Sequence, residues 1–204
     1  MTQSKYPCNA IILAAGNSTR MNKDKALLAF DSEHNFLDQL LYNYTAICDK
    51  VLLVINERLN KGLTNYIFPD NVYIIVNTKP EKGRNYSIFL GISKLANSYP
   101  TFLQNIDNPF TDKTILTSLL LSISSYDYCY PSYFGKGGHP ILISQKIQKA
   151  FLEKYRDDMH FRDFLIHFTR TSCPVIDDKY SLNINTKKEY LNNFGLKNQN
   201  KSEF

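Results

Sequence analysis

The first half of the chain alternates continuous apolar runs with helical patterns. The apolar runs, which are typical of strands buried on both faces, cover residues 10–13, 51–55 and 72–76, and residues 101–106 return to strand character. Between them, apolar residues recur at three- and four-residue spacing in 36–48 and in 88–96, which predicts amphipathic helices. This alternation predicts a doubly wound α/β domain, whose ligands bind beyond the carboxyl ends of the strands.

The pattern is less regular in the second half. Thr111 is predicted to cap a helix, and 131–140 is rich in turn-forming residues. Further strands are predicted at 126–130, 141–143, 175–176 and 182–184, with a helix over 161–168 and a closing helix from Thr186. We expect residues 1–195 to form a single domain and 196–204 to be a frayed tail.

Composition narrows the class of protein. At 204 residues and 43% hydrophobic the chain can bury a full core, and its net charge of +5 is scattered, which suits phosphate-bearing small molecules better than nucleic acid. Four distant cysteines without a C-x-x-C pair indicate core thiols in a reducing compartment. With neither a signal peptide nor a membrane span, we expect a cytoplasmic protein without a membrane partner.

The loop after the first apolar run combines features of a polyphosphate site. Ala14-Ala15-Gly16 leaves main-chain N–H groups accessible, and Ser18 and Thr19 add hydroxyl donors. Arg20 and Lys25 bring two positive charges. The alternative interpretation is an ordinary strand-to-helix turn followed by solvated basic residues.

Polar residues also follow the third and fourth predicted strands. Gly83, Arg84 and Ser87 open a helix, where they could bring donors to a nucleotide or simply cap the helix. Asp107 stands where a strand ends and is followed by Asn-Pro, which suits a ligand of a hard cation but also an Asx-turn.

The opening segment, Leu-Ala-Ala-Gly-x-Ser-x-Arg-Met-x-x-x-Lys over 13–25, resembles the signature of the molybdenum cofactor nucleotidyltransferases, which couple molybdopterin to CTP or GTP. Asn22 stands where that signature usually has Gly. The resemblance implies a three-layer α/β/α sandwich, a Rossmann-like, glycosyltransferase-A-like fold with a mainly parallel sheet. It also implies Mg²⁺ as cofactor and CTP or GTP as co-substrate.

The resemblance assigns roles residue by residue. It implies a catalytic set of Arg20, Lys25 and Asp107, the last matching the metal-binding Asp of the family's Asp-x-Pro motif. Asn185, in an Asn-x-Asn-Thr motif like that of the guanylyl branch, becomes the second metal ligand. The implied nucleotide- and acceptor-binding residues are Leu13, Ala14, Ala15, Gly16, Ser18, Arg20, Lys25, Gly83, Ser87 and His139. His139, in Gly-His-Pro, would contact a phosphate or the pterin, although a turn histidine without a role is the competing interpretation.

The reaction implied is attack by an acceptor phosphate on the α-phosphorus of a nucleoside triphosphate, with release of pyrophosphate. Leu-Ala-Ala-Gly goes with CTP in the resembled family, and the methyl of Ala15 would narrow the space that a purine needs, so we expect transfer of CMP from CTP to molybdopterin.

Two other functions remain open at this point. One is a nucleotidyltransferase for a sugar phosphate or alditol phosphate, because the opening loop is shared across the superfamily. The other is a nucleotide-binding module without turnover, motivated by Asn22, Asn183 and Asn185. A dinucleotide-dependent oxidoreductase is disfavoured because no G-x-G-x-x-G follows the first strand. We expect a monomer or weak homo-oligomer that binds no nucleic acid.

Overall fold

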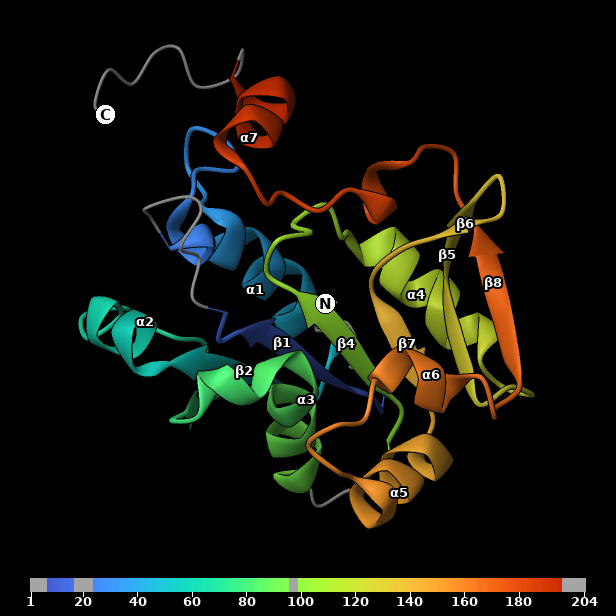
Figure 1. Cartoon of the computed structure of the whole chain (residues 1–204). Coiled ribbons are helices and arrows are strands. Elements are labelled where there is room, and N and C mark those ends of the chain that lie inside the picture. Colours follow the sequence, from blue (N-terminus) through green and yellow to red (C-terminus); the bar gives the residue numbers. More distant parts are fainter. Residues whose placement is uncertain (1–6, 17–23, 96–98, 196–204) are drawn as a thin grey trace.

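One eight-stranded sheet runs through the part of the chain that the computed structural model describes, residues 7–16, 24–95 and 99–195 (Figure 1). Its strands are β1 (Asn9–Ala14), β2 (Lys50–Asn56), β3 (Val72–Asn77), β4 (Thr101–Asn105), β5 (Tyr128–Tyr133), β6 (Lys136–Gly137), β7 (Ile141–Ile143) and β8 (Arg170–Pro174). The spatial order is β3-β2-β1-β4-β7-β5-β6, with β8 paired to β5. The tail predicted over 196–204 lies outside the described residues.

Helices cover both faces of this sheet. They are α1 (Phe36–Ile47), α2 (Glu57–Gly62), α3 (Gly83–Ser93), α4 (Lys113–Ser122), α5 (Gln145–Lys154), α6 (Phe161–Leu165) and α7 (Lys187–Phe194). Because side chains alternate along a strand, Ile12 of β1 packs in one apolar cluster with residues of α1 and α4, whereas Ile11 packs in a second cluster with residues of α3 and α5. The predicted three-layer sandwich is confirmed. Within the described residues, none of the helices has the length and hydrophobicity that crossing a bilayer requires.

The parallel half of the sheet brings the carboxyl ends of β1 and β4 side by side. β3, β2, β1 and β4 are all parallel, and Leu13 of β1 lies opposite Asn105 of β4. The chain proceeds outward from β1 to β2 and β3, then returns to place β4 on the other side of β1. Such a reversal opens a crevice at the carboxyl ends of the two strands. β3 is the outermost strand here, and within the described residues it pairs only with β2.

The antiparallel half corrects several sequence predictions. The predicted turn over 131–140 is partly strand, because β5 continues to Tyr133 and forms a hairpin with β6. Asp112, and not Thr111, caps α4, since Thr111 instead donates its hydroxyl to Gln104. The helix predicted to reach residue 168 ends at Leu165.

The strands predicted at 175–176 and 182–184 are not formed. The strand in this region is β8, which ends at Pro174 and pairs in parallel with β5. In the second segment, the main-chain N–H of Ile184 donates to the carbonyl of Asp107 over 2.7 Å. The closing segment is therefore held by contacts to the end of β4, and not by a strand ladder.

Candidate functional site

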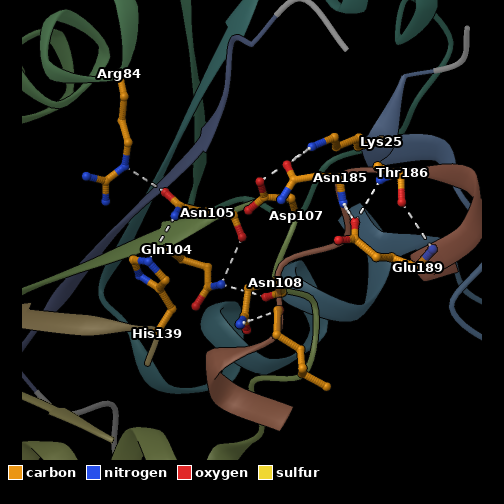
Figure 2. A network of polar contacts seen from close by, with 11 residues as sticks. Lys25, Arg84, Gln104, Asn105, Asp107, Asn108, His139, Asn185, Thr186 and Glu189 are labelled. Carbon is orange, nitrogen blue, oxygen red and sulfur yellow. Dashed lines mark hydrogen bonds and ion pairs between the residues drawn. The ribbon is translucent and has the colours of Figure 1, made fainter. Parts of the chain in front are cut away.

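Lys25, Asp107 and Asn185 come together at the carboxyl edge of the sheet (Figure 2). Lys25 Nζ lies 2.7 Å from Asn185 Oδ1 and 3.5 Å from Asp107 Oδ2. The side chains of Lys25 and Asp107 are 13% and 23% exposed, so this ion pair is largely shielded from water. Asp107 and Asn185 lie 82 and 160 positions after Lys25 in the sequence, yet the three side chains form one polar cluster.

The local backbone structure explains how each of these three residues is positioned. Lys25 opens a short 3-10 helix, Lys25–Leu27, and Asp107 follows β4. Asn185 immediately precedes the cap of α7, where Thr186 and Glu189 form a capping box. Glu189 Oε2 also accepts the main-chain N–H of Asn185 over 2.7 Å, and this hydrogen bond lowers the pKa of Glu189 below its ordinary value. The capping carboxylate is therefore ionised at neutral pH and fixes the backbone of Asn185.

Asn108 holds the closing segment against β4, a role that the sequence analysis missed. Its side-chain amide donates to the carbonyls of Tyr180 and Leu182, each over 2.8 Å, and it is fully buried. Gln104 Nε2 in turn donates to the carbonyl of Asn108 over 2.6 Å. The available signal was the run of amide side chains in and just after an apolar strand, since buried amides must find hydrogen-bond partners.

The oxygens around Lys25 fit a divalent cation. Asp107 Oδ1 is buried and has no hydrogen-bond partner among the described residues, although a buried carboxylate oxygen normally has one. Asp107 Oδ2 and Asn185 Oδ1 both point to the Lys25 ammonium, so the site already holds a positive charge. The described residues contain no group of three or more His, Cys, Asp or Glu side chains arranged for a metal. One carboxylate and one amide suit Mg²⁺, which keeps water and substrate phosphate as its other ligands.

The loop after β1 is tied to β2 by Asn56. Its Nδ2 donates to the carbonyls of Ala15 and Gly16 over 3.3 and 3.2 Å, while its Oδ1 caps α2. A Cβ added at Gly16 would meet no atom within 4 Å, so the space beside this residue is open in the described structure. Leu13, Ala14 and Ala15 are buried, and their side chains belong to the apolar clusters. Ser18 and Arg20, predicted in the same loop, lie outside the described residues.

Gly83 and Ser87 are placed at the start of α3 with different surroundings. Gly83 has a φ of +76°, which favours glycine, and a Cβ there would meet nothing within 4 Å. Ser87 is 4% exposed and accepts a hydrogen bond from Asn77 at the end of β3. In this hydrogen bond Ser87 is the acceptor, so its hydroxyl still has a hydrogen to donate, and the nucleotide contact of Ser87 stays a prediction.

His139 contacts Asn105 at the end of β4. Its Nε2 lies 3.0 Å from Asn105 Nδ2. Among the described residues no hydrogen-bond partner satisfies the buried Nδ1, although the Leu103 backbone acts to raise the pKa of His139. Burial, followed by the positive charge of Arg84, lowers the pKa of His139 to about 3. The ring is neutral at physiological pH. The contact of His139 with a phosphate or the pterin stays a prediction, and in the structure Nε2 of the ring faces the Asn105 amide.

Arg84, in the first turn of α3, also contacts the side-chain amide of Asn105. Its Nε donates to Asn105 Oδ1 over 2.9 Å, so Arg84, Asn105 and His139 form a chain of hydrogen bonds across the ends of α3, β4 and the segment before β7 (Figure 2). The sequence analysis placed Arg84 near a ligand but gave no partner for it.

Comparison with protein families gives one match over most of the chain. The model of the MobA-like NTP transferase domain matches residues 10–171. A search of curated protein sequences finds no match.

Several solved structures share the fold. Rv0371C from Mycobacterium tuberculosis H37Rv, in complex with manganese, has a TM-score of 0.72 and 14% identity, over 94% of this chain and 100% of that one. A 4-diphosphocytidyl-2C-methyl-D-erythritol synthase from Anaerococcus prevotii has a TM-score of 0.69 and 14% identity, covering 93% of this chain and 96% of that chain. A molybdopterin-guanine dinucleotide biosynthesis protein A from Archaeoglobus fulgidus has a TM-score of 0.65 and 16% identity, covering 92% and 97% of the two chains. At identities of 14% and 16%, these likenesses show a shared fold alone.

Proposed function

This chain belongs to the MobA-like NTP transferase domain family, and on that premise we propose that it transfers CMP from CTP to the phosphate of a small-molecule acceptor. An acceptor phosphate oxygen forms the new bond to the α-phosphorus, and pyrophosphate leaves with the electron pair of the broken P–O bond. The observation that carries the proposal is the convergence of Lys25, Asp107 and Asn185 at the carboxyl edge of the parallel strands, the edge at which β1 ends before Gly16.

The chemistry requires positioning and charge neutralisation more than proton transfer. The acceptor is already an anion, so the protein has to hold two negatively charged groups in line and offset their repulsion. Lys25 is suited to bind the triphosphate, together with the main-chain N–H groups after β1 and with Arg20. Asp107 and Asn185 would hold Mg²⁺, which supplies charge neutralisation at the phosphate oxygens. The manganese in the M. tuberculosis relative supports a divalent ion here.

For the acceptor we propose molybdopterin. The family and the likeness to the A. fulgidus protein support this choice. The likeness to the A. prevotii synthase supports the second candidate, an alditol phosphate. Pyrophosphate release, measured with each acceptor in turn, decides between them, and absence of turnover with nucleotide bound would favour a binding module.

For the nucleotide we propose CTP over GTP. Ala15 is 5% exposed, and its methyl packs in the apolar cluster on the α3 face, directly after the end of β1. We propose that this methyl narrows the space for a purine, and a methyl in a tight binding site is worth ~1–3 kcal/mol, about ten- to a hundredfold in affinity. Calorimetry with Mg²⁺ should show tighter CTP than GTP binding, and Ala15→Gly should narrow the difference. Tighter GTP binding by the unmodified protein would move the assignment to GTP.

The assigned residues are tested by turnover. Lys25→Ala and Asp107→Ala should each lower the rate of pyrophosphate release by ~10²-fold or more, because each removes a charged group from the transferring phosphoryl group. Lys188→Ala, on the exposed face of α7, is the matched control and should retain the full rate. Near-normal turnover of either site variant would refute its role.

A further inference from the structure

We propose that Arg84 is a second anion site of this cleft and binds the phosphate monoester of the acceptor, with Asn105 and His139 as its positioning residues. The proposal rests on the proposed function, because it divides the two substrates of that reaction between two cations. Lys25 would serve the triphosphate, and Arg84 the acceptor.

The guanidinium of Arg84 is held at one end and available at the other. Nε donates to Asn105 Oδ1 over 2.9 Å, whereas neither terminal nitrogen has a hydrogen bond or ion pair within the described part of the chain. The residue is exposed to solvent. Guanidinium groups bind phosphate through two parallel N–H donors, and the terminal nitrogens of Arg84 remain available for this.

His139 determines which way the Asn105 amide points. Asn105 Nδ2 donates to Nε2 of the neutral ring over 3.0 Å, which leaves Oδ1 directed at Arg84. If the amide were reversed, its NH₂ group would face the N–H of Arg84, donor against donor. A neutral imidazole with Nε2 as acceptor therefore orients the amide, and the amide orients the arginine, without any contact between His139 and a ligand.

The position of this chain of residues favours the acceptor over the triphosphate. Asn105 lies opposite Leu13, in the crevice where the strand order reverses, and Asp107 follows two residues later with Lys25 on its far side. In Figure 2, Arg84 and Lys25 lie on opposite sides of the Asn105–Asp107 segment. The reaction requires two anionic groups to meet, and the cleft offers one cation on each side of their meeting point.

The experiment separates the two anions. Calorimetry first measures binding of the α,β-methylene analogue of CTP with Mg²⁺, and then titrates inorganic phosphate into the nucleotide-saturated protein. Arg84→Met should weaken phosphate binding about ten- to a hundredfold, since it removes charge-assisted hydrogen bonds, and should change nucleotide affinity less than about twofold. Arg162→Met, an exposed arginine of α6, is the matched control and should change neither.

A pair of substitutions tests the positioning role. His139→Leu should weaken phosphate binding although the residue touches no ligand, and His139→Gln, which retains an acceptor for Asn105, should restore it at least in part. Thermal unfolding of each variant identifies any loss of folded protein, and His139→Gln keeps the test valid if His139→Leu fails to fold.

Each contrary result has a defined meaning. Unchanged phosphate affinity in Arg84→Met overturns the proposal, and an equal loss of nucleotide affinity reassigns Arg84 to the triphosphate. Equal phosphate affinity in all three forms at position 139 overturns the positioning role. Absence of nucleotide binding by the unmodified protein overturns the proposed function instead, and phosphate is then titrated into the free protein, where Arg84→Met must still lose affinity.

Discussion

At the scale of single residues, Lys25 contacts the same two oxygens that we propose as metal ligands. Its ammonium lies 3.5 Å from Asp107 Oδ2 and 2.7 Å from Asn185 Oδ1. A divalent ion bound to these oxygens would lie close to the Lys25 ammonium. Both are positively charged, and like charges at such short distances repel strongly in a site that is shielded from water. We therefore infer that the metal binds well only when the triphosphate draws Lys25 away.

The first prediction follows from this competition. Lys25→Met should raise the affinity of the free protein for Mn²⁺ by about tenfold or more, equivalent to ~1.4 kcal/mol, because it removes the competing ammonium while preserving the length of the side chain. Electron paramagnetic resonance of free Mn²⁺ measures this directly. Lys188→Met should have no effect, and Asp107→Asn should weaken binding. Unchanged or weaker Mn²⁺ binding by Lys25→Met would contradict the competition.

His139 predicts how stability depends on pH. Its pKa falls from an ordinary value of about 6.5 to about 3 on folding, mainly through burial and secondly through Arg84. The stability associated with the neutral ring is thus fully present above pH 6.5 and is lost as pH falls from there toward 3, because only the unfolded chain takes up the proton. The limiting slope is ~1.4 kcal/mol per pH unit for one group.

Chemical unfolding at pH 7.5, 6 and 5 checks this expectation. The free energy of unfolding of the unmodified protein should fall more steeply with acidification than that of His139→Gln, which carries no titrating group at this position. Parallel pH dependences for the two proteins would contradict a neutral, buried ring.

At the scale of elements, two glycines have opposite roles. A Cβ at Gly138 would lie 2.3 Å from the carbonyl oxygen of Tyr180, where the chain before β7 passes close to the closing segment. A Cβ at Gly16, after β1, would meet no atom of the described residues within 4 Å. The first glycine is required by packing, and the second leaves space that we assign to the triphosphate.

Alanine at these positions separates folding from binding. Gly138→Ala should destabilise the protein by ~2 kcal/mol or more, because backbone must shift, whereas Gly16→Ala should change stability by about 0.5 kcal/mol or less. Gly16→Ala should nevertheless weaken nucleotide binding, since its methyl occupies the open space. Thermal unfolding and calorimetry measure the two effects. Normal nucleotide affinity in Gly16→Ala would remove the loop after β1 from the proposed site.

The elements that the sequence predicted well are those whose signal is local. β1, β2 and β3 are built around continuous apolar runs, and the helical spacing of Phe36 to Ile47 coincides with α1. Lys25 and Asp107 were expected to lie together at the carboxyl edge of the sheet, and their ion pair confirms this proximity, whereas their roles in the reaction stay predictions.

The contacts that the sequence could not predict are those that join distant segments. Arg84 is hydrogen-bonded to Asn105, which lies 21 residues later in the sequence. Asn105 in turn contacts His139, which lies another 34 residues later. Similarly, residues 182–184 have the composition of a strand, but the backbone here bonds to Asp107 and to the side chain of Asn108. Such pairing is decided by tertiary packing, which propensity and periodicity do not encode.

At the scale of the whole molecule, the site is completed by a segment beyond the part that matches the family. The match ends at residue 171, whereas Asn185 lies just before α7. This helix is anchored by Phe194, whose ring centroid lies 5.2 Å from that of Phe36 and 5.5 Å from that of Phe110. The aromatic cluster links the closing helix to α1 and to the turn after Asp107, so the position of Asn185 depends on the core on this face.

The outer edge formed by β3 also affects how copies of the chain behave in concentrated solution. In the part of the chain that the structure describes, β3 pairs only with β2. Tyr73 and Ile74 on this strand are 49% and 40% exposed, which makes the strand a template for aggregation. Lys50 and Lys94 line a groove together with Tyr73 and Ile74. Because these lysines are positively charged and the net charge of the chain is +5, repulsion between copies opposes association. Light scattering should therefore rise with salt, which screens that repulsion, and Ile74→Lys should suppress the rise. Scattering that is independent of salt in both proteins would show that the β3 edge is protected by other means.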